Sequence, residues 1–127
     1  HLGRLSLADL ALDSFPYTSH STGCDALWAG VPLITKMGET FASRIAASLL
    51  HTVGLPELIA ATWEEYFDLA YALATQPEKL KAVREKLAHG RLSSPLFDTV
   101  QFTHDLEALY LRMWEQYRSG HRAPILA

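Results

Sequence analysis

The chain has 127 residues, of which 49% are hydrophobic and 20% are charged, a composition typical of one compact domain and not of a disordered tail. Its 11 Lys and Arg residues against 14 Asp and Glu residues give a net charge of −3. This balance excludes the broad cationic surface that non-specific nucleic-acid binding needs. No apolar run approaches the roughly 20 residues that cross a bilayer, so we expect no membrane span.

The single cysteine, Cys24, bears on the cellular compartment. One cysteine cannot form an internal disulfide or a cysteine-rich zinc site, and no secretory signal is visible. We therefore expect a cytoplasmic protein. The chain begins at His1 rather than at Met, which favours a fragment of a longer protein.

The first third of the chain predicts a β-α-β unit. Leu10–Phe15 is an apolar run typical of a strand, and Tyr17–Gly23 is rich in the small polar residues of a loop. Cys24–Ala29 follows as a short helix that Gly30 ends, and Val31–Thr35 follows as a second buried strand.

The rest of the chain is mostly helical in pattern. Phe41–Val53 has the apolar spacing of a helix, Leu58–Ala60 is a short third strand, and helices alone follow Thr62. The last helix, Asp98–Arg118, carries a stripe of apolar residues that needs a packing partner: Phe102, Leu106, Leu109, Tyr110, Met113 and Tyr117. Parallel strands joined by helices predict an α/β fold of the doubly wound type, whose sheet needs further strands at its edges.

In such folds ligands bind beyond the carboxyl ends of the strands, where loops lead into helices. The loop before the first predicted helix offers Ser21 and Thr22 as capping residues and His20 as a further donor, a combination that suits a phosphate. The carboxylate of Asp25, one turn into the helix, suits two adjacent sugar hydroxyls. The pattern therefore favours a nucleotide with both phosphate and ribose.

Structural interpretations of the same residues stay open on local grounds. Thr22 and Asp25 have capping-box spacing, His20 is by default a histidine in a loop, and Cys24 is more typical of packing than of a nucleophile. At the next strand end, Thr40 is a candidate helix cap, and Arg44 in the first turns opposes the helix dipole.

Several standard motifs are absent from the sequence, among them the dinucleotide-binding G-x-G-x-x-G, the P-loop and the G-x-S-x-G elbow. Four histidines lack the mutual spacing of a metal site and are expected on the surface: His51, His89, His104 and His121. We expect no metal site.

Five separated blocks resemble, in the same order, the C-terminal end of the O-linked N-acetylglucosamine transferases, family 41 of the glycosyltransferases. They are Leu7–Pro16, His20–Gly30, Gly38–Leu50, Gly54–Ala60 and Ser93–Asp98. The resemblance implies the C-terminal Rossmann-like half of a GT-B enzyme that transfers N-acetylglucosamine from UDP-GlcNAc to Ser and Thr hydroxyls of proteins. Residues 1–97 would form part of the donor-binding half, and residues 98–127 a helix that packs back on the missing N-terminal half, with TPR repeats further upstream.

The resemblance also implies roles for six residues. The segment matching His20, Ser21 and Thr22 holds the diphosphate in that family, the residue matching Asp25 binds the ribose, and those matching His1 and Arg4 lie against the uracil. Ser21 replaces a threonine but keeps the hydroxyl, and Lys36-Met37 stands where a proline commonly precedes G-E-T.

The mechanism implied by the resemblance is inverting transfer without a metal or other cofactor. The family's catalytic groups lie upstream, so no catalytic residue falls in this chain, and the chain alone should be inactive. Two alternatives stay open: a protein O-fucosyltransferase that uses GDP-fucose, which typically has Glu in place of Asp25, and a non-catalytic nucleotide-binding module.

Overall fold

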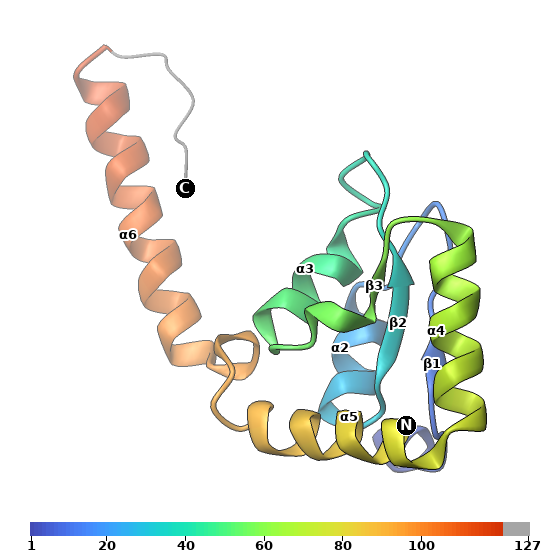
Figure 1. The fold of residues 1–127 in the computed structure, drawn as a ribbon. Coiled ribbons are helices and arrows are strands. Elements are labelled where there is room, and N and C mark those ends of the chain that lie inside the picture. The colour runs from blue at the N-terminus through green and yellow to red at the C-terminus, as the bar shows by residue number, and fades with distance from the viewer. Residues whose placement is uncertain (121–127) are drawn as a thin grey trace. The chain divides into compact units, whose positions relative to one another are not determined.

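The structure, a computed structural model, describes residues 1–120, which fall into two compact units, His1–Phe97 and Asp98 onward. In the first unit, three short parallel strands form one sheet in the order β1-β2-β3 (Figure 1). These are β1 (Ala11–Leu12), β2 (Leu33–Lys36) and β3 (Ile59–Ala60). Ala11 is in register with Leu33, and Thr35 with Ile59, so β2 is the central strand. The predicted parallel α/β arrangement is confirmed.

Helices cover both faces of the sheet (Figure 1). Helices α2 (Ser21–Trp28) and α3 (Ile45–Thr52) lie on one face, and α4 (Trp63–Thr75) lies on the other. The remaining elements of this unit are α1 (Leu2–Leu5), η1 (Pro56–Leu58), α5 (Pro77–Gly90) and η2 (Pro95–Phe97). Because β2 is covered on both faces, its consecutive residues Leu33, Ile34 and Thr35 are all buried, as expected for a central parallel strand.

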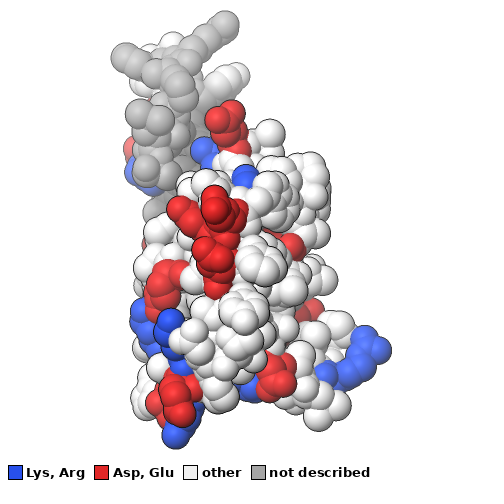
Figure 2. All heavy atoms as spheres, turned by 45° about the vertical axis from the view of Figure 1, so that its right-hand side comes forward, with Lys and Arg blue, Asp and Glu red and all other residues white. Residues whose placement is uncertain are grey.

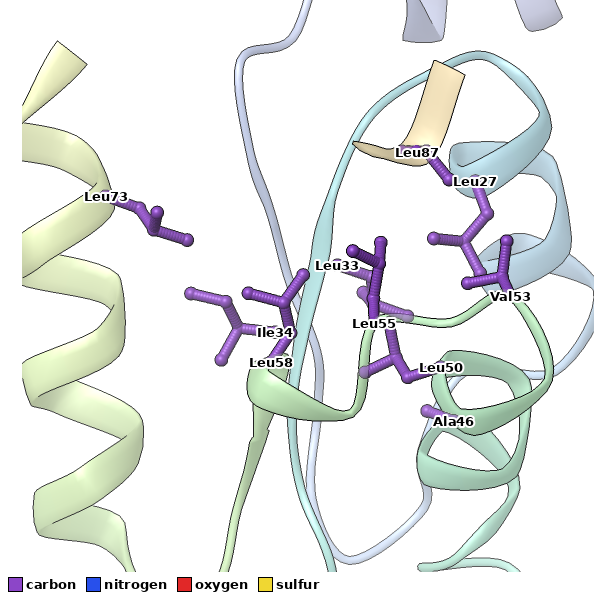
Figure 3. Close-up of a cluster of buried hydrophobic side chains, with 10 residues drawn as sticks. All are labelled: Leu27, Leu33, Ile34, Ala46, Leu50, Val53, Leu55, Leu58, Leu73 and Leu87. Carbon is purple, nitrogen blue, oxygen red and sulfur yellow. The ribbon is translucent and has the colours of Figure 1, made fainter. Parts of the chain in front are cut away.

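The hydrophobic core surrounds β2 (Figure 3). Consecutive strand residues point to opposite faces, and both Leu33 and Ile34 are fully buried, so the central strand contributes to the core on both sides. Leu27 and Leu50 come from the helices of one face, and Leu73 comes from α4 on the other. This packing holds the carboxyl ends of the strands, and the loops that follow them, in fixed positions.

The predicted elements are present, but several boundaries differ. The helix expected from Cys24 begins at Ser21, and the helix expected from Phe41 begins only at Ile45. Gly30 ends the first of these helices with φ +80°, a left-handed conformation that favours glycine, as predicted.

The second unit contains helix α6 (Thr99–Arg118), whose N-cap Asp98 accepts a hydrogen bond from the Gln101 amide at 2.9 Å. Its large apolar side chains are exposed, including Phe102, Tyr110, Met113 and Tyr117. The packing partner predicted for this stripe stays a prediction. Residues 121–127, the end of the segment predicted as 98–127, lie outside the described residues.

Acidic and basic side chains are interspersed on the face of the molecule drawn in Figure 2. Among the described residues on this face, no continuous basic patch is present, which agrees with the net charge of −3. Within residues 1–120, the helices are all too short or too polar to cross a membrane.

Candidate functional site

Asp13 organises the loop that follows β1, at the carboxyl edge of the sheet. Its carboxylate is buried, and Oδ1 accepts hydrogen bonds from the amides of Ser14 at 3.0 Å and Ser19 at 2.8 Å. Oδ2 accepts a bond from the Thr35 hydroxyl on β2 at 2.6 Å. One carboxylate therefore fixes both ends of the loop and ties them to the central strand.

Thr18 joins the same loop to the segment before α3. Its amide and its hydroxyl both donate to the Ala42 carbonyl, at 3.1 Å and 2.6 Å, and its Oγ1 accepts from the Ala46 amide at 3.3 Å. The loop is thus held from two sides, although it lies at the surface. A loop fixed in this way can present backbone groups to a ligand without first having to become ordered.

The N-terminus of α2 emerges directly from this loop. His20 is the N-cap, and no side chain caps the helix. In the part of the chain that the structure describes, the amides of Ser21, Thr22 and Gly23 donate no hydrogen bond. These free N–H groups and the positive end of the helix dipole form a site that favours an anion.

Gly23 places this helix end close to the sheet and to α3. A Cβ at position 23 would lie 3.0 Å from Ser19 Cβ, 3.2 Å from Leu49 and 3.3 Å from Leu33. A side chain there would push α2 outward, so the glycine permits the close packing that fixes the free amides in space.

His20 lies beside these amides, and its imidazole is held by a neighbouring ring. Tyr17 stacks on it with the ring centroids 4.9 Å apart and the planes 8° from parallel. Nε2 of His20 is buried and has no hydrogen-bond partner among the described residues. His20 is therefore a fixed polar group at the helix end with one nitrogen still to be satisfied.

Asp25 and His1 lie together on the outer side of α2. Asp25 Oδ2 is 3.4 Å from His1 Nε2, and both side chains remain partly exposed, at 41% and 54%. His1 precedes α1, which also carries the exposed Arg4. The structure thus brings the side chains of His1 and Asp25 together as predicted site residues. Arg4 joins them through its backbone, because its amide donates to the His1 carbonyl at 3.1 Å.

Three details of local structure differ from the sequence prediction. Ser21 and Thr22 do not cap α2, because they lie inside its first turn and the cap position belongs to His20. The capping-box interpretation of Thr22 and Asp25, left open on local grounds, is therefore wrong. Thr40 does not cap α3: its hydroxyl donates to Ser43 Oγ at 2.9 Å within a preceding turn, and Arg44 is the N-cap residue.

A groove of about 500 Å³ lies at the same edge of the sheet, beyond β2. Its lining is Phe15, Lys36, Met37, Gly38, Glu39 and Ala61. The Lys36 ammonium lies 4.4 Å from the ring centre of Phe15 and 5.6 Å from that of Trp63. Aromatic faces thus fix a positive charge near the loop after β1.

A second groove of about 520 Å³ lies at the opposite end of α2, against α5. The helix presents carbonyl groups at this end, so its dipole disfavours an anion there. Arg91 already donates a hydrogen bond to the Trp28 carbonyl. The N-terminus of α2 is therefore the better candidate for anion binding.

Cys24 is not a strong nucleophile in this environment. Burial raises the pKa of its thiol above the ordinary value, and the neighbouring charge of Asp25 raises it further. The thiol consequently stays protonated at neutral pH, which supports the packing interpretation.

Residues 1–120 contain no group of three or more His, Cys, Asp or Glu side chains that could hold a metal ion. His51, His89 and His104 are exposed or only partly buried, in agreement with the prediction of surface positions. His121 lies outside the described residues.

Sequence reasoning missed Asp13, Thr18 and Tyr17, which hold the site together. Asp13 carried a signal, since an aspartate at the end of an apolar strand and before several Ser and Thr residues is typical of a carboxylate that accepts backbone N–H bonds. Thr18 and Tyr17 carried no such signal, because their partners become neighbours only in the folded chain.

The chain is similar in sequence to known glycosyltransferases. Residues 1–106 match the family profile described as Glycosyl transferase family 41. A UDP-N-acetylglucosamine--peptide N-acetylglucosaminyltransferase of Caenorhabditis elegans is 44% identical over 120 residues, which cover 94% of this chain and 10% of the relative. A probable enzyme of the same name, SEC of Arabidopsis thaliana, is 42% identical over 123 residues, or 96% of this chain and 13% of the relative.

Among solved structures, a mutant O-GlcNAc transferase of Thermobaculum terrenum superposes with a TM-score of 0.83 at 41% sequence identity. The match covers 89% of this chain and 22% of that chain. The chain therefore spans between a tenth and a quarter of the length of the proteins that it resembles.

Proposed function

Because the chain belongs to glycosyl transferase family 41, we propose that it supplies the nucleotide-binding part of an enzyme that transfers N-acetylglucosamine from UDP-GlcNAc to protein Ser and Thr hydroxyls. The observation that carries the proposal is the set of unpaired amides at the start of α2, in a loop fixed by Asp13 and Thr18. Its relatives are named for transfer of N-acetylglucosamine to peptides.

The diphosphate of the donor binds at the N-terminus of α2. The amides of Ser21, Thr22 and Gly23 donate to phosphate oxygens, and the hydroxyls of Ser21 and Thr22 add donors because neither is used as a cap. His20 contributes a ring N–H. Charge-assisted bonds of this kind are about twice as strong as neutral ones.

The nucleoside binds along the outer side of α2. Asp25 Oδ1 is free to accept a bond from a ribose hydroxyl, since the contact with His1 uses Oδ2. The imidazole of His1, held beside this carboxylate, stacks on the uracil, and Arg4 on α1 lies against the base. These six residues, His1, Arg4, His20, Ser21, Thr22 and Asp25, form the proposed donor site.

The proposed reaction is an inverting transfer that needs no metal ion or other cofactor. The acceptor hydroxyl oxygen bonds to the anomeric carbon while the bond from that carbon to the UDP oxygen breaks, and the hydroxyl proton passes to a base outside this chain. The amides and His20 stabilise the charge that develops on the departing diphosphate, as fixed donors do in other enzymes. No residue of this chain touches the acceptor in this proposal, so the chain alone should be inactive.

The rest of the enzyme would come from sequence upstream of His1. We propose an N-terminal catalytic half that completes a GT-B cleft, preceded by TPR repeats, in a cytoplasmic protein. The exposed apolar stripe of α6 would pack on that catalytic half.

Isothermal titration calorimetry of the full-length protein with UDP and with GDP tests the proposal. We expect UDP to bind and GDP to bind more weakly, with no added divalent ion. A preference for GDP would support a fucosyltransferase that uses GDP-fucose instead, and binding of neither nucleotide would support a non-catalytic module. The presence of aspartate rather than glutamate at position 25 favours the first outcome.

A further inference from the structure

Tyr17 is an exposed aromatic residue with an ordered environment. Its side chain is 65% exposed, so burial in the core does not explain its position. Its backbone is held on both sides, because the Ser14 hydroxyl donates to the Tyr17 carbonyl at 2.7 Å and the next residue, Thr18, bonds to Ala42. The ring is therefore supported at a defined place, where it lies flat on the imidazole of His20.

The two ring nitrogens of His20 have different surroundings. Nε2 is buried and meets no hydrogen-bond partner among residues 1–120, whereas Nδ1 is not buried in this way. A neutral imidazole carries its proton on one nitrogen only, and a buried N–H without an acceptor is costly. The proton is therefore better placed on Nδ1, where water or a bound anion can accept it.

Stacking fixes the plane of the His20 ring. The flat contact with Tyr17 restrains tilting of the imidazole and shields one of its faces from water. Loss of this contact would admit water to Nε2. A proton on Nε2 would then have an acceptor, and the imidazole would no longer favour protonation of Nδ1 alone.

We propose that Tyr17 is a positioning residue: by stacking on His20 it maintains the Nδ1–H form of the imidazole, which donates a hydrogen bond to the diphosphate of the nucleotide. The inference rests on the proposed function for the identity of the acceptor. The proton position, by contrast, is a property of the protein without ligand and can be measured independently.

Nitrogen-15 NMR of histidine-labelled full-length protein tests the proton position. The signals of His20 are identified by their loss in His20→Ala. We expect the wild type and Tyr17→Phe to show a protonated Nδ1 and an unprotonated Nε2, and Tyr17→Ala to show a mixture of both forms. The matched control is Tyr71→Ala, which removes another exposed tyrosine, stacked on Phe67 of α4 instead of on His20. This control should leave the His20 signals unchanged.

Calorimetry with UDP tests the consequence for binding. Loss of an aromatic contact predicts that Tyr17→Ala weakens UDP binding about 3- to 10-fold, whereas Tyr17→Phe and Tyr71→Ala bind as the wild type does. In a His20→Ala background, the change Tyr17→Ala should have no further effect, because Tyr17 acts through His20.

The results separate the two proposals. If the wild type does not bind UDP, the proposed function is wrong, and the NMR experiment still decides the role of Tyr17. If UDP binds but Tyr17→Ala retains the single Nδ1–H form, or weakens binding equally with and without His20, the positioning role is wrong.

Discussion

The buried carboxylate of Asp13 and the hydroxyl of Thr35 join the ends of two neighbouring parallel strands by a hydrogen bond of 2.6 Å. The other oxygen of the same carboxylate accepts hydrogen bonds from the amides of Ser14 and Ser19 and from the Ser19 hydroxyl. Its position between β2 and the loop before α2 makes Asp13 the structural support of the proposed donor site, although it contacts no part of the proposed ligand.

Replacement of Asp13 by alanine should therefore lower both stability and nucleotide binding. Hydrogen bonds to charged groups contribute about 1.5 to 3 kcal/mol, and we expect the free energy of unfolding in urea to fall by at least that range. UDP affinity should fall as well, because the loop no longer holds the amides of α2 in place.

Asp9→Ala is the matched control for this change. Asp9 is an aspartate just before β1 whose side chain is 83% exposed and pairs with Arg84 at the surface. Exposed ion pairs contribute little, so its removal should change the unfolding free energy by less than about 1 kcal/mol. Equal losses for the two variants would show that Asp13 is not a special support.

The order and type of the elements followed from sequence patterns with clear physical causes. Apolar runs predicted β1 and β2, and Gly30 predicted the end of α2. The starts of α2 and α3 were less predictable. Ser21 and Thr22 have the chemistry of caps but lie inside the helix, because Asp13 already fixes the preceding loop and no local side chain is needed to begin it.

The proposed site, like the helix starts, could be predicted from the sequence only where its residues are neighbours in the chain. His20, Ser21 and Thr22 could be singled out as a local group because they are adjacent in the sequence. The contact between His1 and Asp25 joins residues far apart in the chain, and only the family resemblance suggested that they serve one ligand. Long-range contacts of this kind depend on packing and leave no periodic signal in the sequence.

Asp25→Ala should weaken UDP binding without unfolding the protein. The side chain is partly exposed and forms an ion-pair contact with His1, which is also partly exposed, so little stability depends on it. Loss of charged hydrogen bonds to the ribose should reduce the binding free energy by about 1.5 to 3 kcal/mol, measured by calorimetry.

Glu57→Ala is a suitable comparison, because Glu57 is likewise partly exposed and pairs with one cation, Lys86. It should bind UDP as the wild type does. Unchanged affinity in Asp25→Ala would remove Asp25 from the proposed site.

Gly38→Ala should destabilise the loop at the end of β2. A Cβ at position 38 would lie 2.7 Å from Ser43 Cβ and 3.0 Å from Phe15, so the turn that contains Ser43 must move. Overpacking of this kind costs about 1 to 3 kcal/mol in unfolding free energy, measured by urea denaturation. Gly3→Ala is the control, since a Cβ there would have nothing within 4 Å, and its stability should stay close to that of the wild type.

Ionisation of Tyr66 should lower the free energy of unfolding as the pH rises in the alkaline range. Burial of the phenol, reinforced by the charge of Asp13, raises the pKa of Tyr66 above its ordinary value of 10.0, and its hydroxyl donates to the Asp13 carbonyl at 2.9 Å. Because the pKa of Tyr66 is higher in the folded than in the unfolded protein, the neutral phenol stabilises the fold. This stabilisation is complete below the pKa of the unfolded state and is lost as the pH rises through the pKa of the folded state.

Tyr66→Phe isolates this effect. The variant loses one hydrogen bond, which should lower the unfolding free energy by about 1 kcal/mol at neutral pH. Between about pH 9 and about pH 12, its stability should then fall less steeply than that of the wild type, because it cannot ionise at this position. If the unfolding free energies of the wild type and Tyr66→Phe, measured by urea denaturation, fall equally across this range, ionisation of Tyr66 does not contribute.

Cys24 should react slowly with iodoacetamide in the folded protein. Burial and then the charge of Asp25 raise the pKa of its thiol, so the reactive thiolate is scarce at neutral pH. Alkylation, followed by mass spectrometry, should accelerate when the chain is unfolded in urea. It should also accelerate, to a smaller extent, in folded Asp25→Asn, which removes the neighbouring charge but keeps the shape of the side chain.

Cys24→Ser should retain UDP binding, because the thiol packs and does not contact the donor in this site. Rapid alkylation of the folded wild type, slowed by UDP, would instead place the thiol in the binding site.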